Sequence, residues 1–76
     1  MKELLLTMAK ALVDYPSQVE IKEVEGERTK ILELKVAETD RGKIIGKEGR
    51  IIKAIRTIVN AASAKQNKRV SVEIIE

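Results

Sequence analysis

The sequence predicts an α+β domain in which three helices cover one face of a three-stranded mixed sheet. Apolar residues recur at helical spacing in three segments and alternate with polar residues in three others, in the order α-β-β-α-α-β. The last two strands are separated by two helices, a connection long enough to make them parallel neighbours. The first two strands are joined by a short turn and run antiparallel, so the sheet is mixed.

The N-terminal half is predicted to form a helix followed by a hairpin. Residues 2–14 carry leucine, methionine and alanine at helical spacing, and Pro16 stops this helix because the residue before a proline disfavours helix. Strands are expected at 18–24 and 31–36, on either side of a turn at Gly26.

The C-terminal half is predicted to form two helices and a strand at 70–74. Thr39 is the expected N-cap of a short helix at 40–45, and Gly46 is the expected residue that ends it. A long helix is expected at 48–65, because its apolar residues fall in one arc. The polar residues that alternate along the strands are expected on the open face of the sheet: Glu20, Lys22, Glu33, Lys35, Ser71 and Glu73.

Composition excludes several classes of function. The chain has 76 residues and no cysteine or histidine, so disulfides, the usual zinc sites and histidine catalysis are excluded. Nearly every acidic residue falls on an expected surface position, so we expect no enzyme, no cofactor and no metal. No stretch has the length of a membrane span or the apolar run of a signal peptide, which predicts a cytoplasmic protein without a membrane partner.

Positive charge is concentrated in one part of the chain. Residues 41–56 contain six basic residues and one acidic residue, a net charge of +5, whereas the rest contains nine basic and eleven acidic residues, a net charge of −2. The alternative is a solvated helix face whose charges serve only solubility. A localised basic patch nevertheless favours an anionic partner held in one orientation.

The centre of this basic segment is a glycine-containing joint between two helices. Residues 44–55 read I-I-G-K-E-G-R-I-I-K-A-I, with Gly46 and Gly49 three positions apart and Lys47 and Arg50 beside them. Glycine adopts positive φ and allows another backbone to approach closely. The first turn of the following helix also has free N–H groups that suit an anion such as a phosphate.

The segment 42–55, G-K-I-I-G-K-E-G-R-I-I-K-A-I, resembles the signature of KH domains, an RNA-binding family, and the element order matches their type II arrangement. The resemblance extends along the chain. Segments A-L-V-D (11–14), V-E-G-E (24–27) and I-K-A-I-R-T-I-V (52–59) are similar to the small stand-alone bacterial KH proteins of the KhpA family.

This resemblance implies a single type II KH domain over residues 1–76. Its KH core would span about 29–76, preceded by the helix at 2–14 and the strand at 18–24.

The resemblance also implies that the G-x-x-G loop clamps the backbone of about four nucleotides of single-stranded RNA. The glycines would permit close approach, Lys47 would supply charge, and other basic residues would flank the strand. The predicted RNA-binding residues are Lys43, Ile45, Gly46, Lys47, Glu48, Gly49, Arg50 and Lys53.

Bases are expected to lie in an apolar groove lined by Ile44 or Ile45, by Ile52 and by a residue of the strand at 31–36. The chain has one aromatic residue, Tyr15, so aromatic base stacking is excluded and weak binding with little sequence preference is expected.

The basic residues that follow the segment 42–55 are interpreted as solvated surface residues. These are Arg56, Lys65, Lys68 and Arg69.

Glu48 has two interpretations. In the first, Glu48 lies in the clamping loop, where its carboxylate repels phosphate unless the side chain points outward. In the second, the carboxylate stabilises the N-terminus of the long helix through the helix dipole. We favour the second interpretation.

Partners are implied by the family resemblance alone. It implies a homodimer, a complex with a larger Jag-type KH protein, or both, and a role as an RNA chaperone or post-transcriptional regulator linked to cell elongation or division. Leu5 and Leu6 are candidate subunit contacts, because so small a domain needs few core residues. The competing hypothesis is a protein-interaction or dimerisation module in which RNA binding is secondary.

Overall fold

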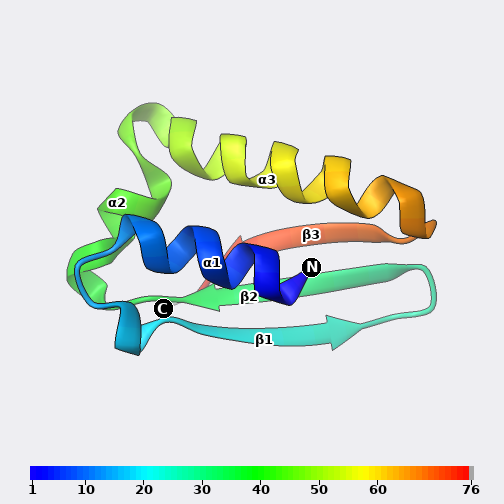
Figure 1. Ribbon diagram of the computed structural model, residues 1–76, viewed down its shortest axis with the longest axis horizontal. Helices are drawn as coiled ribbons and strands as arrows, with labels where there is room; N and C mark the ends of the chain where they lie inside the picture. The colour runs from blue at the N-terminus through cyan, green and yellow to red at the C-terminus, as the bar shows by residue number, and fades with distance from the viewer. Residues whose placement is uncertain (76) are drawn as a thin grey trace.

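The computed structural model describes residues 1–75, and over this range the elements follow the predicted order (Figure 1). The N-terminal half contains helix α1 (Lys2–Leu12) and strands β1 (Glu20–Glu25) and β2 (Thr29–Lys35). The C-terminal half contains helices α2 (Arg41–Ile45) and α3 (Arg50–Ser63) and strand β3 (Arg69–Ile74).

The strands form a mixed sheet in the order β1-β2-β3, as predicted. Strand β1 is antiparallel to β2, with Glu20 opposite Lys35. Strand β3 is parallel to β2, with Thr29 opposite Arg69. Because β2 is central, β1 and β3 each keep one edge without a neighbouring strand in the sheet.

One face of the sheet packs against α1, α2 and α3 (Figure 1). Alternate strand residues such as Leu32, Leu34 and Val72 point into this core. The helices contribute Leu5, Ala9, Ile44, Ile52, Ile55 and Val59 to the same cluster. On the opposite face Glu33 is half-buried, and the other polar residues expected there are exposed. The predicted α+β architecture with helices on one face is therefore confirmed.

Leu5 was expected at a subunit contact, and this expectation is wrong. Its side chain is completely buried in the core, and Leu6 packs against the same cluster. Leu5 is therefore a core residue, and Leu6 is partly buried beside it.

The helix boundaries differ from the predicted ones. Helix α1 ends at Leu12, because Val13 is already extended at φ −102° and ψ 161°. Helix α3 runs from Arg50 to Ser63 and is shorter at both ends than the predicted 48–65. The turn expected at Asn67 is confirmed, and this residue has a left-handed backbone at φ 54°.

Thr39 does not cap α2, contrary to the prediction. Asp40 holds the N-cap position, and no side chain caps the helix there. The Asp40 carboxylate is instead completely buried and accepts hydrogen bonds from the backbone N–H groups of Asp14 and Tyr15, each at 3.0 Å. It thereby ties the segment after α1 to the start of α2.

No helix within residues 1–75 is long and apolar enough to cross a membrane.

The Asp40→Asn variant is expected to unfold more easily, by roughly 1.5–3 kcal/mol. The amide keeps the volume of the side chain but turns one acceptor into a donor that faces one of the two backbone N–H groups. Urea denaturation measures the difference. Asp14→Asn is the control: its carboxylate is exposed, so its free energy of unfolding should change by no more than about 0.5 kcal/mol. Equal stability of Asp40→Asn and the wild type would contradict the anchoring role.

Candidate nucleic-acid interface

The joint between α2 and α3 is a tight turn built on two glycines with positive φ. Gly46 (φ 75°) ends α2, and its N–H donates to the carbonyl oxygen of Gly42 at 2.9 Å. Gly49 (φ 73°) precedes α3, and its N–H donates to the carbonyl oxygen of Gly46 at 3.2 Å. The N–H groups of Lys47 and Glu48 donate to no other backbone group within residues 1–75, so they remain available to a ligand.

The two glycines are required for different reasons. A Cβ atom on Gly46 would lie 2.5 Å from Cγ1 of Ile51, so the close packing of the turn onto α3 excludes a side chain there. A Cβ atom on Gly49 would meet nothing nearer than 3.9 Å. Gly46 therefore shapes the turn, whereas Gly49 leaves open space beside the backbone where a phosphate could approach.

Glu48 has a left-handed backbone at φ 58° and ψ 25°, which is uncommon for a residue with a side chain. The expectation that it lies in the long helix is wrong, because it precedes the N-cap Gly49. Its Oε2 lies 3.6 Å from Nη2 of Arg50, in an exposed ion pair that contributes little to stability. Such local strain in a turn is a reason to suspect a functional constraint.

The basic residues predicted to flank RNA are not all on one side of the turn. Lys53 lies beside the open side of Gly49, with its Cε 3.9 Å from the position of the missing Cβ. Arg50 lines an apolar cleft between α1 and α3 instead. Lys43 donates to Oδ2 of Asp14 at 2.6 Å, and this hydrogen bond raises the pKa of the lysine above its ordinary value.

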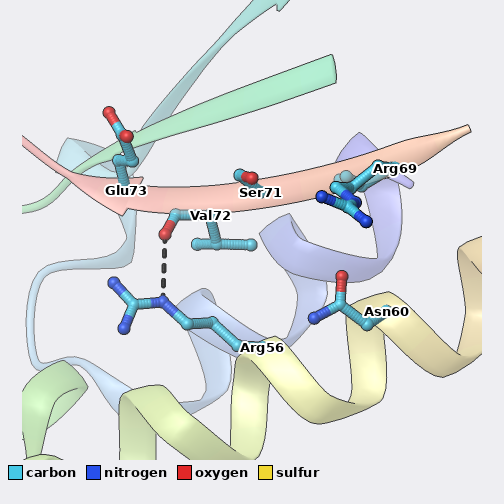
Figure 2. Close-up of a pocket in the computed structure, with 7 residues that line it drawn as sticks. Arg56, Asn60, Arg69, Ser71, Val72 and Glu73 are labelled. Carbon is cyan, nitrogen blue, oxygen red and sulfur yellow. Dashed lines mark hydrogen bonds between the residues drawn. The ribbon is translucent and has the colours of Figure 1, made fainter. Parts of the chain in front are cut away.

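A groove of about 430 Å³ lies between α3 and the free edge of β3 (Figure 2). The residues that line it are Arg56, Asn60, Arg69, Val70, Ser71, Val72 and Glu73. None of these residues comes from the strand at 31–36, which was expected to contribute to the base-binding groove, because β2 is central and paired on both edges. Ile44 and Ile52 are buried in the core, whereas Ile45 is 40% exposed at the surface.

Arg56 was interpreted as a solvated surface residue, and it is exposed, but its side chain also reaches across the groove. Its Nε donates to the carbonyl oxygen of Val72 on β3 at 3.1 Å. The sequence contains one signal that Arg56 belongs with the predicted site: it follows Lys53 by three residues and so shares its helix face. The position of β3 beside that face could not be read from the sequence.

Two helices joined by a G-x-x-G turn, packed with α1 on a mixed sheet, define a type II KH domain. A family model for the KH domain of KhpA/KhpB matches residues 2–74. The chain belongs to this KhpA/KhpB KH-domain family.

Similar proteins cover nearly the whole chain. It is 64% identical over 75 residues to the RNA-binding protein KhpA of Clostridium acetobutylicum, covering 99% of this chain and 100% of that protein. The RNA-binding protein KhpA of Caldanaerobacter subterraneus is 60% identical with the same coverage. The RNA-binding protein KhpA of Borreliella burgdorferi is 49% identical, covering 97% of this chain and 90% of that protein.

Two solved structures of Era share the fold. One is Aquifex aeolicus Era bound to GDP and AlF4⁻, and the other is Era in complex with MgGDPNP and nucleotides 1506–1542 of 16S ribosomal RNA. Each has a TM-score of 0.66 and 22% identity, covering 96% of this chain. This chain spans only 28% of the length of either Era chain, so the likeness concerns the KH fold alone.

The Gly46→Ala variant is expected to be strongly destabilised. At φ 75° and ψ 174° the backbone of Gly46 lies in a region essentially restricted to glycine, which costs another residue about 1–3 kcal/mol. Overpacking against Ile51 costs about 1–3 kcal/mol, so the sum is roughly 2–6 kcal/mol in thermal or urea unfolding. Gly42→Ala is the matched control, because a Cβ there meets nothing within 4 Å and alanine favours a helix. Equal losses in the two variants would show that the turn does not depend on the packing of Gly46.

Proposed function

We propose that this chain binds single-stranded RNA through the turn Gly46–Gly49 and the groove beside α3. The observation that supports this most directly is the open space at Gly49, where positive φ and the lack of any atom nearer than 3.9 Å to the missing Cβ position let a phosphate reach the backbone. Lys47 lies in the same turn, is exposed, and has no ion-pair partner in the described residues. Relatives of 49–64% identity are named RNA-binding proteins.

The predicted site residues then take unequal roles. The N–H groups of Lys47 and Glu48 donate to phosphate oxygens, and the ammonium group of Lys53 extends the positive charge toward the groove. Lys43 and Arg50 contribute less, because the first pairs with Asp14 and the second lies on the side of α3 that faces α1. Ile45 offers exposed apolar surface to a base.

The proposed activity is binding without catalysis, cofactor or metal, by one KH domain acting in the cytoplasm. The RNA-binding names of the relatives support the absence of a catalytic role.

A protein partner is the second proposal, supported by an apolar cleft of about 410 Å³ between α1 and α3. Leu12 and Ile58 at this cleft are 40% and 47% exposed. The cleft and the groove lie on opposite flanks of α3, so a second copy of this chain or a larger Jag-type KH protein could bind at the cleft while RNA occupies the groove.

The double variant Lys47→Asp, Glu48→Asp is expected to lose RNA affinity by at least about tenfold, because it removes a charged phosphate contact and adds repulsion. Aspartate tolerates the left-handed backbone at position 48 better than most residues, so the fold should persist. Fluorescence anisotropy with a labelled oligouridine measures binding, and sedimentation measures the oligomeric state.

The control for this variant is Lys2→Asp, which makes the same change of −2 in charge. Lys2 is the first residue of α1, whereas Asp14, which contacts α2, follows the other end of that helix. An acidic residue also suits a helix N-terminus. RNA affinity that is unchanged in the loop variant while a dimer dissociates would overturn the RNA proposal and favour the interaction module.

Affinity for RNA should also fall with salt. For Z phosphate contacts to a single strand, log K is expected to decrease with log salt concentration with a slope of roughly −0.7Z. Titrations between low and physiological salt measure this slope. An affinity that does not change with salt is incompatible with a phosphate clamp.

A further inference from the structure

We propose that Arg56 makes the groove select bases with two adjacent hydrogen-bond acceptors, guanine or cytosine, over adenine and uracil. This inference rests on the RNA binding proposed above and specifies which bases that site accepts.

The first argument is how the Arg56 guanidinium is held. Its Nε–H donates to the carbonyl oxygen of Val72, which fixes the group across the groove on the edge of β3. In Figure 2 its two terminal nitrogens point away from Val72, toward the N-terminal end of α3 where the G-x-x-G turn lies. Within residues 1–75 Arg56 makes no ion pair, so these terminal N–H groups remain available.

The second argument is the hydrogen-bonding character of the groove wall. The N–H groups of Arg69 and Ile75 donate to the carbonyl oxygens of Arg28, just before β2, and of Leu34 in β2, so the odd-numbered residues of β3 face β2. The backbone groups of the even-numbered residue Val72 therefore face the groove. Arg56 donates its Nε–H to the Val72 carbonyl there. Asn60 lies beside it on α3 and offers both a donor and an acceptor, whereas the guanidinium of Arg56 can only donate (Figure 2).

Base chemistry then determines the preference. Two parallel N–H donors of one guanidinium match two adjacent acceptors, as in the pairing of arginine with O6 and N7 of guanine. Cytosine offers O2 and N3 on its Watson–Crick edge, which is open in a single strand. Adenine places an amine donor beside each ring acceptor on these edges, and in uracil a ring N–H separates the two carbonyl oxygens. Neither base matches the fork.

The experiment compares four RNA octamers: oligouridine, and oligouridine with one central guanosine, cytidine or adenosine. The wild-type protein should bind the guanosine octamer, the cytidine octamer or both at least about fivefold more tightly than the other two. Arg56→Lys keeps the charge but lacks the planar fork, so its affinities for the four octamers should agree within about twofold. The control Arg28→Lys, in the turn between β1 and β2, should keep the wild-type preference.

The outcomes separate this inference from the proposed function. Equal binding of all four octamers by the wild type, preference for adenosine, or a preference that survives in Arg56→Lys would overturn the role of Arg56 and leave the RNA clamp intact. Failure of the wild type to bind any octamer would overturn the clamp, and with it this inference.

A second measurement needs no variant, should Arg56→Lys fold poorly. The side-chain Nε–H signal of Arg56 in the wild-type NMR spectrum should shift on adding the preferred octamer and shift less with the adenosine octamer. An Arg56 signal that stays in place at saturating RNA would overturn the inference.

Discussion

The parallel pairing of β2 with β3 is the constraint on which the rest of the structure depends. Two parallel strands cannot be joined by a tight turn, so the chain must cross over the sheet before β3 begins. Helices α2 and α3 make this crossing, and the G-x-x-G turn lies where they meet (Figure 1). The same pairing makes β3 an edge strand beside α3. The turn at the start of α3 and the groove along its side therefore both follow from the sheet topology.

Helix α3 has three faces with different surroundings. Ile52, Ile55 and Val59 form its core face, Arg56 and Asn60 face the groove, and Ile51 and Ile58 face the cleft beside α1. The helix is held by its buried face, so side chains on its two flanks can serve different partners. This separation would let one small domain bind RNA and a protein without competition.

Sequence patterns predicted the three α-helices and three strands of residues 1–75, because alternation and helical spacing reflect burial on one face. They failed at element ends, where single interactions decide. Thr39 suits an N-cap by residue type, but Asp40 holds that position and its carboxylate binds the backbone of a segment 25 residues away. Glu48 favours a helix start by charge, yet the left-handed turn places it outside α3.

The sequence by itself determined the fold class, the family resemblance and the place of the G-x-x-G turn, because periodicity, glycines and charge are local features of the chain. Only the tertiary structure decided which strand borders the groove and what each glycine does. Gly46 is required by contact with Ile51, whereas Gly49 has open space beside it. Arg56 is exposed, as expected, but its hydrogen bond to the Val72 carbonyl, on a strand 16 residues later, could not be read from the sequence. Contacts between distant segments depend on how helices and strands pack, and no local pattern records them.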